Sequence, residues 1–233
     1  MSAAPDSPGF PVYVTGSTEA PRALIVLQEA FGVNDHIRDV ADRLAGAGYF
    51  VIAPHLFHRN GSPEIAYDDF DRVRPLMAEL TVEGLTNDLD ATTKFLGSLG
   101  FGPASVGVVG FCMGGTVSFY AATLAGVGAA VSFYGGGLTK GRFGLPPLLE
   151  LATSLRAPWL GLFGDLDTGI ASDDVETLRS VLASVPVATE VVRYRDAQHG
   201  FHCDARPAVY NDAAARDAYR RTLDFFDEQL RDK

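Results

Sequence analysis

The 233-residue sequence has little cysteine, no cluster of positive charge and no long apolar run. Its two cysteines, Cys112 and Cys203, cannot form a disulfide framework, which favours a reducing compartment. The formal net charge is -10 and no basic run interrupts it, so nucleic acid is a poor candidate partner. No apolar run approaches membrane-spanning length, and Met1 to Pro11 lack the basic and apolar regions of a secretory signal. These absences predict a cytoplasmic protein that binds neither nucleic acid nor a membrane.

Strand-like and helix-like segments alternate along the whole chain. Strands are expected at residues 22–27, 49–53, 105–109, 128–134, 159–164 and 189–194, with an edge strand at 10–14. Residues 22–27, 49–53 and 159–164 are apolar runs of the kind typical of strands buried on both faces. Helices are expected at residues 36–45, 70–80, 82–99, 116–124 and 173–183, the last with Ser172 as its cap, and in a long segment ending near Leu230. This order predicts an α/β fold with a mostly parallel, doubly wound sheet and helices on both faces. We expect one domain over residues 1–233, without a cap domain and with residues 1–9 frayed, as a monomer or small homo-oligomer.

The segment from Gly110 to Gly115, GFCMGG, organises the rest of the interpretation. It lies between a strand-like run and a helix-like run, which is the layout of the nucleophile elbow G-x-S-x-G, with Cys112 in place of serine. Glycine on both sides removes bulk that so tight a turn could not hold. Backbone N–H groups at the start of the following helix favour a thiolate and a developing oxyanion. The alternative, a buried structural cysteine, does not account for the surrounding glycines.

A nucleophile needs a base and an acid, which in this arrangement follow it in the order nucleophile, acid, histidine. Asp165 and Asp167 follow one predicted strand, and His199 follows the next, so all three are expected at the sheet edge where Cys112 stands. His199 can take up the thiol proton, and a carboxylate can fix its tautomer. Position alone does not separate Asp165 from Asp167. His202 is a second candidate base.

Three further residues follow strand ends. Glu29 is either a solvated loop carboxylate or, if it points inward, a group that takes the thiol proton when a substrate arrives. His55 and His58 carry none of the usual zinc-site spacings, so we interpret them as loop residues and predict no metal site. No glycine loop for a phosphate is present either, and we expect no cofactor.

Four segments together resemble the dienelactone hydrolase family, the carboxymethylenebutenolidase-type branch of the α/β-hydrolases. They are Gln28 to Asn34, Gly110 to Gly115, Gly164 to Asp167 and Ala197 to Phe201, in the family's order. The resemblance implies an α/β-hydrolase fold in which Cys112 is the nucleophile, His199 the base, Asp167 the third member and Glu29 the activator of the thiol. It also implies that the N–H groups of Ala30 and Met113 form the oxyanion hole, that Phe31 lies at the substrate site, and that Arg206 binds a substrate carboxylate.

The sequence departs from the family pattern in three places. Arg72 and Arg74 lack the family's spacing to a tyrosine in the region of its second arginine. His55 replaces an acid after the third strand, and residues 202–205 are inserted before Arg206.

The sequence therefore predicts a hydrolase of a small activated ester, such as a carboxylate-bearing enol lactone, acting through an acyl-cysteine. A thiolate leaves more easily than an ordinary alkoxide, whereas an enolate leaves readily, so cysteine suits a substrate with a stabilised leaving group. The alternatives are a broader esterase or thioesterase, and a non-catalytic protein of this fold that binds a ligand or senses oxidants through Cys112.

Overall fold

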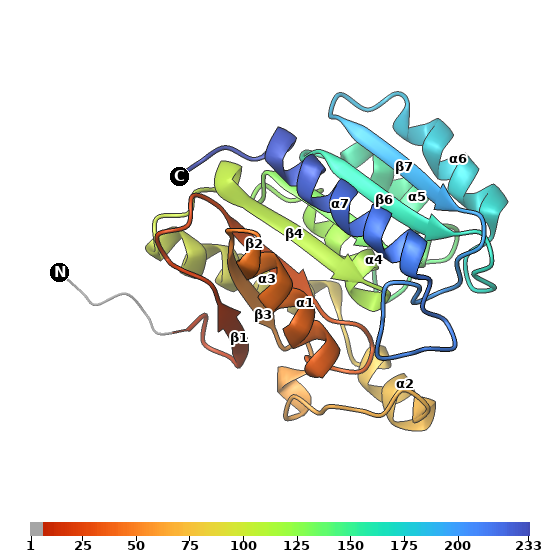
Figure 1. The fold of residues 1–233 in the computed structure, drawn as a ribbon, viewed down its shortest axis with the longest axis horizontal. Coiled ribbons are helices and arrows are strands. Elements are labelled where there is room, and N and C mark those ends of the chain that lie inside the picture. The colour runs from red at the N-terminus through yellow and green to blue at the C-terminus, as the bar shows by residue number, and fades with distance from the viewer. Residues whose placement is uncertain (1–6) are drawn as a thin grey trace.

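A computed structural model of the protein describes residues 7–233. Residues 1–9 were expected to be frayed; of these, residues 1–6 lie outside the described part, and residues 7–9 form no helix or strand. The strands are β1 (Val12–Thr15), β2 (Ala23–Leu27), β3 (Phe50–Pro54), β4 (Val106–Phe111), β5 (Ala129–Phe133), β6 (Trp159–Gly164) and β7 (Thr189–Tyr194). They form one sheet in the order β1-β3-β2-β4-β5-β6-β7 (Figure 1). Every pairing is parallel except that of the edge strand β1 with β3.

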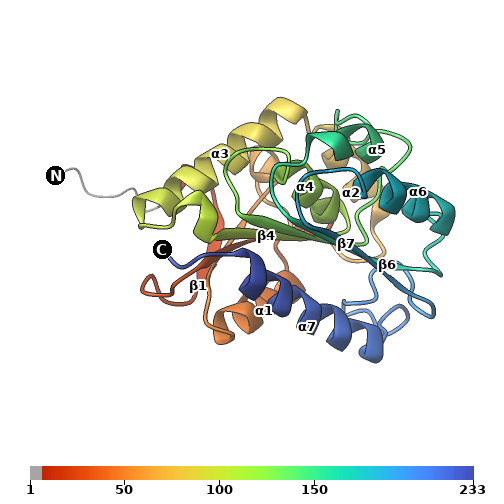
Figure 2. The same cartoon turned by 90° about the horizontal axis from the view of Figure 1, so that it is seen from above.

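Helices cover both faces of this sheet. They are α1 (Asp35–Gly46), α2 (Phe70–Ala78), α3 (Val82–Ser98), α4 (Met113–Ala121), α5 (Leu148–Leu151), α6 (Ser172–Leu182) and α7 (Asp212–Gln229), with short 3₁₀ turns at His58–Asn60, Pro103–Ser105 and Ala152–Ser154. Figure 2 shows α1 and α7 on one face and α3, α4, α5 and α6 on the other. Strands β2 to β6 are buried along their whole length, as continuous apolar runs between two helical layers should be. The predicted doubly wound α/β sheet is confirmed.

Helix ends agree with the sequence in part. Asn34 caps α1 by accepting a hydrogen bond from the N–H of Ile37. The prediction that Ser172 caps α6 is wrong: Ser172 is the first helical residue and Ala171 holds the cap position without a side-chain bond. Asp173 and Asp174 in the first turn supply the negative charge that favours this helix end. The short helix α5 lies in a connection for which no helix was expected.

The turn between β4 and α4 is packed against neighbouring backbone on all sides. Cys112 has a φ of 55°, which only a strongly constrained non-glycine residue adopts. A Cβ on Gly110 would lie 1.9 Å from the carbonyl oxygen of Gly114, and one on Gly114 would lie 2.2 Å from that of Leu27. The glycines therefore allow the backbone contacts that hold Cys112 in this conformation.

Replacing Gly114 by alanine should destabilise the fold, because the new methyl group meets backbone of β2 that cannot rotate away. We expect the free energy of unfolding to fall by about 3 kcal/mol or more, the upper range for overpacking a core. Gly97→Ala is the control, since a Cβ there meets no atom within 4 Å and the residue lies inside α3. That change should stabilise the protein by up to about 1 kcal/mol through helix propensity. Urea unfolding of both variants tests the expectation, and equal effects would contradict it.

Candidate active site

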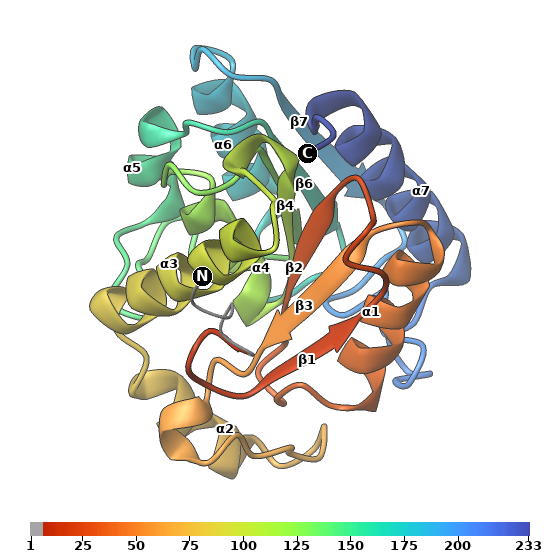
Figure 3. The ribbon, with the colours of Figure 1, turned by 90° about the vertical axis from the view of Figure 1, so that its left-hand side faces the viewer.

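The segments singled out from the sequence meet at one edge of the sheet. The loops after β2, β4, β6 and β7 all leave the carboxyl ends of parallel strands of one sheet, in which β5 lies between β4 and β6. Figure 1 shows the β7–α7 connection and α2 at the edge where the arrows of these strands end, and Figure 3 shows α2 beyond the end of β3. Ligands of open α/β sheets bind at this edge.

Cys112 is half-buried at the cap position of α4 and is fixed by backbone bonds. Its N–H donates to the carbonyl of Phe133 at 3.0 Å, and the N–H of Gly114 donates to the carbonyl of Gln28 at 3.1 Å. The second bond joins the elbow to the loop after β2. Within residues 7–233, no backbone or side-chain acceptor takes the N–H of Ala30 or of Met113. In the described residues these two N–H groups, one next to Cys112 and one in the loop that the elbow contacts, therefore have no hydrogen-bond partner.

His199 and Asp167 form a close pair. His199 Nδ1 lies 2.6 Å from Asp167 Oδ2, and Asp167 Oδ1 accepts from the N–H of Gly169 at 2.8 Å. The Asp167 side chain is 2% exposed and that of His199 is 35% exposed, so the carboxylate is hidden while the imidazole reaches the surface. Burial lowers the pKa of His199, but the Cys112 sulfur and the Asp167 carboxylate outweigh it and raise the pKa to about 10. The charged imidazolium form of His199 is therefore favoured at this position.

Asp165 has a different partner. Its Oδ1 accepts from Arg193 Nε at 2.6 Å, and the other side of that guanidinium binds Glu176 at 2.8 Å. This carboxylate is therefore engaged in a part-exposed ion-pair network, whereas Asp167 contacts the histidine.

Glu29 points inward and is 1% exposed, so the solvated-loop interpretation is wrong. Tyr134 donates its hydroxyl hydrogen to Glu29 Oε1 at 3.2 Å, while Glu29 Oε2 is buried without a partner in the described residues. Burial, and then the charge of Glu29, raises the pKa of Tyr134 well above its usual value, so the phenol stays a donor. The sequence did not identify Tyr134 as a site residue. Its position at a predicted strand end, directly before three glycines, was the only signal for it.

Tyr134 also joins Glu29 to the histidine. The Tyr134 and His199 ring centroids are 5.0 Å apart, and Tyr134 takes a φ of 40° at the end of β5. Its buried ring therefore packs against the His199 ring while its hydroxyl donates to the Glu29 carboxylate.

Arg206 lies over aromatic faces. The centre of its guanidinium is 5.2 Å from the Tyr67 ring centroid and 5.7 Å from that of Phe31. No carboxylate in residues 7–233 forms an ion pair with it, although most arginines of the described chain have such a partner. Arg72 and Arg74 are exposed on α2 and pair with Asp69 and Asp71 on their own helix.

The remaining histidines lie outside this group. His202 is buried against Phe111 and Phe133, and its Nδ1 has no partner in the described chain. His58 Nε2 lies 3.1 Å from Asp88 Oδ1. Among residues 7–233 no set of three or more His, Cys, Asp or Glu side chains is placed to hold a metal ion. No described helix is long and apolar enough to cross a membrane.

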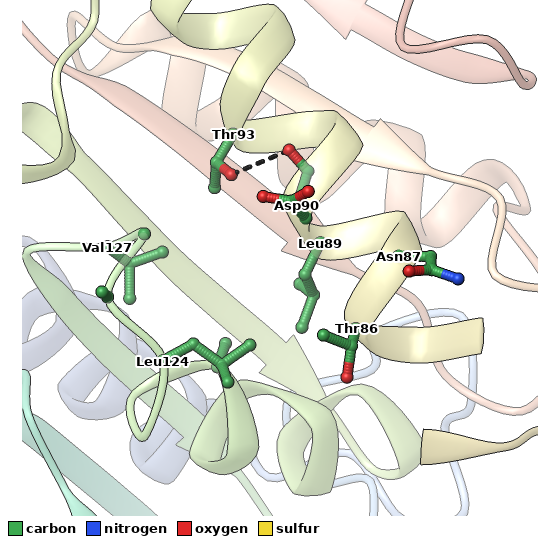
Figure 4. A pocket seen from close by; sticks show the side chains of 10 residues that line it. Thr86, Asn87, Leu89, Asp90, Thr93, Leu124 and Val127 are labelled. Carbon is green, nitrogen blue, oxygen red and sulfur yellow. Dashed lines mark hydrogen bonds between the residues drawn. The ribbon is translucent and has the colours of Figure 1, made fainter. Parts of the chain in front are cut away.

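A separate hollow lies away from these residues. It measures 380 Å³, and Figure 4 shows it between α3 and the α4–β5 loop, bordered by Thr86, Asp90, Leu124 and Val127. Since Cys112 precedes the first residue of α4 and this hollow touches its last residue, Ala121, the two lie at opposite ends of the helix. The hollow has no histidine or cysteine, so its lining offers no nucleophile or base comparable to those at the strand ends.

Residues 10–230 match the family model described as Dienelactone hydrolase family. The chain belongs to the dienelactone hydrolase family. A protein of Salmonella typhimurium provisionally named carboxymethylenebutenolidase is 37% identical over 95% of this chain and 82% of its own. The Rhodococcus opacus carboxymethylenebutenolidase is 28% identical over 94% of this chain and 86% of its own length. The crystal structure of a provisionally named dienelactone hydrolase from Klebsiella pneumoniae superposes with a TM-score of 0.85 at 34% identity, covering 94% of this chain and 93% of that one.

Family membership confirms two predictions made from the sequence. The fold is that of the α/β-hydrolases, and the chain is an ester-hydrolysing enzyme of the carboxymethylenebutenolidase type. The sequence motifs at the four strand ends carried this resemblance, and they are the segments that meet in space.

The buried His202 should make stability depend on pH. Burial, and then the charges of His36 and Arg43, lower its folded-state pKa from 6.5 to about 3. The unfolded chain therefore binds a proton that the folded one does not, so between these values the free energy of unfolding falls as pH falls, by about 1.4 kcal/mol per pH unit. His202→Leu should remove this contribution. Urea unfolding from pH 7 to 4 should give a shallower decline in the variant; parallel curves would contradict the assignment.

Proposed function

We propose that this enzyme hydrolyses an activated ester or enol lactone through an acyl-cysteine, with Cys112 as nucleophile, His199 as base and Asp167 as the orienting acid. The observation that carries the proposal is the 2.6 Å contact of His199 with the buried Asp167, next to a cysteine in a strained elbow. The raised pKa of His199, to which the Cys112 sulfur contributes, supports a thiolate–imidazolium pair.

The first half of the reaction forms a thioester. The Cys112 thiolate attacks the ester carbonyl, and the resulting oxyanion accepts hydrogen bonds from the N–H groups of Ala30 and Met113. When the C–O bond breaks, the leaving oxygen departs as an enolate, which takes the proton of the His199 imidazolium. Asp167 holds Nδ1, so that Nε2 is the nitrogen that exchanges this proton.

The second half releases the acid. Neutral His199 removes a proton from water as the water oxygen attacks the thioester carbon, and the C–S bond then breaks to restore the thiolate. Glu29 is proposed to accept a hydrogen bond from the resting thiol and to take its proton when a substrate arrives, which its buried, partnerless Oε2 supports. Tyr134 occupies the other oxygen and so leaves only one free.

The substrate proposed here carries a carboxylate. The net charge of -10 disfavours anions in general, so a site for one needs a local cation. Arg206 is half-buried and has no ion-pair partner in residues 7–233, which suits a bidentate contact with a carboxylate. Phe31 lies beneath the guanidinium and offers a flat apolar surface to a conjugated ligand.

Trapping the acyl-enzyme tests the proposed function. Intact-protein mass spectrometry after addition of a slowly hydrolysed aryl ester should show a single acyl adduct that Cys112→Ala abolishes. Cys203→Ala is the matched control and should keep the adduct, because Cys203 is buried and burial raises its pKa to about 11. An adduct that survives in Cys112→Ala, or maps to Cys203, would refute the assignment.

The two aspartates give a second test. Asp167→Asn should lower kcat by orders of magnitude, about 10⁴-fold in the best-studied triad, because the imidazole loses the partner that fixes its tautomer. Asp165→Asn is the control, since Asp165 binds Arg193 on the protein surface and should affect kcat little. Steady-state kinetics on dienelactone compares them. A crippled Asp165→Asn beside a mild Asp167→Asn would exchange the two roles.

A further inference from the structure

Tyr67 was not singled out from the sequence, yet it touches the cation proposed to bind substrate. Of the two rings beneath the Arg206 guanidinium, that of Tyr67 is the nearer, at 5.2 Å. The ring also packs edge-on against Phe31 at 4.8 Å, so the two aromatic side chains form one corner. A guanidinium over an aromatic face is attracted by the ring quadrupole, and the contact restricts where a long, flexible side chain can lie.

The Tyr67 ring is itself fixed from α1. Asn34 Oδ1 accepts the N–H of Ile37 as the cap of α1, which leaves its Nδ2 to donate to the Tyr67 hydroxyl at 3.2 Å. The buried thiol of Cys203 donates to the same oxygen at 3.4 Å. Burial raises the pKa of Tyr67 and of Cys203, so both groups stay neutral. The helix cap thus sets the orientation of the ring.

Arg206 is also close to the base. A Cβ on Gly200, the residue after His199, would lie 2.8 Å from Arg206 Nη1. The guanidinium therefore lies against the backbone next to the histidine, and an anion held there would place the rest of a small molecule near Cys112. A displacement of the guanidinium would remove this alignment while leaving His199 and Asp167 in place.

We propose that Tyr67, oriented by Asn34 and Cys203, is a positioning residue that holds the Arg206 guanidinium where it receives the substrate carboxylate. This inference rests on the proposed function for the identity of the substrate. In this role Tyr67 makes the enzyme selective for anionic esters without itself touching the reacting atoms.

Kinetics on paired substrates separate this role from a structural one. Tyr67→Leu removes the aromatic face, so KM for dienelactone should rise about tenfold, the upper range of a cation–π contact, with kcat little changed. Hydrolysis of the neutral 4-nitrophenyl acetate should stay at the wild-type level. Tyr67→Phe keeps the ring and should restore a KM near that of the wild type. Tyr13→Leu, a half-buried tyrosine of β1 that binds Asp42, controls for loss of a tyrosine and should change neither substrate.

A double variant tests whether Tyr67 acts through Arg206. If it does, Tyr67→Leu combined with Arg206→Ala should be no worse on dienelactone than Arg206→Ala alone. Multiplied losses, or equal damage of Tyr67→Leu to both substrates, would overturn the proposal.

A binding measurement makes the result independent of turnover. In the Cys112→Ala background, calorimetry with benzoate should show binding about tenfold weaker after Tyr67→Leu, with the neutral isostere benzamide unaffected. Unchanged benzoate affinity would overturn the proposal even if esters are hydrolysed. If, by contrast, the wild-type enzyme neither hydrolyses the esters nor forms an acyl adduct on Cys112, the proposed function is refuted. The benzoate measurement then still decides whether Tyr67 positions Arg206.

Discussion

The close approach of the β4–α4 turn to the backbone of β2 and β5 is the constraint on which the site depends. Gly110, Gly114 and Gly115 would each place a Cβ within 2.6 Å of a backbone atom. Because no side chain fits, these segments lie in direct backbone contact, and Cys112 is held with a φ of 55° at the mouth of α4. The cost of this conformation, of order 1–3 kcal/mol, is offset by the packing and hydrogen bonds around it.

The same contact arranges the charges near the thiol. The bond from Gly114 to the carbonyl of Gln28 brings the loop after β2 against the elbow, and that loop carries Glu29 into the interior. A buried carboxylate oxygen without a hydrogen-bond partner is costly, because it has lost water and gained no donor in exchange. Tyr134 supplies only one hydrogen bond. The unpartnered Oε2 of Glu29 therefore lowers the stability of the fold locally. Buried polar groups without a partner are often found at reactive sites.

Much of this architecture follows from sequence because it is encoded locally. The strands β6 and β7 begin and end at the predicted residues; β6 is a continuous, fully buried apolar run, whereas β7, at the sheet edge, is mixed in polarity and mostly half-buried. The elbow and the order of Asp167 and His199 were likewise readable. Position alone left Asp165 and Asp167 open, and only the fold, which brings Arg193 beside one and His199 beside the other, separates their surroundings.

What the sequence could not show are contacts between distant segments. Tyr134 meets Glu29 across 105 positions and Cys203 meets Tyr67 across 136, and no periodicity or motif encodes either pair. The error at Ser172 has a related cause: a serine before an acidic turn resembles a cap, but the backbone entering α6 is already helical one residue earlier. Sequence patterns describe one element at a time, whereas these features depend on two.

The two halves of the site are supported differently, which bears on how such an enzyme can change substrate. Cys112, Asp167 and His199 follow the carboxyl ends of β4, β6 and β7 of the one sheet, where a shift in any of them would disturb the core. Arg206 and Tyr67 instead belong to connections outside the sheet. Tyr67 is held by the Arg206 guanidinium over its ring, by Asn34 at the cap of α1 and by the thiol of Cys203. Each of these contacts contributes on the order of 1 kcal/mol, so exchanging one costs little stability. In this arrangement the proposed chemistry is tied to the fold, while the proposed preference for an anionic substrate depends on a few replaceable side chains.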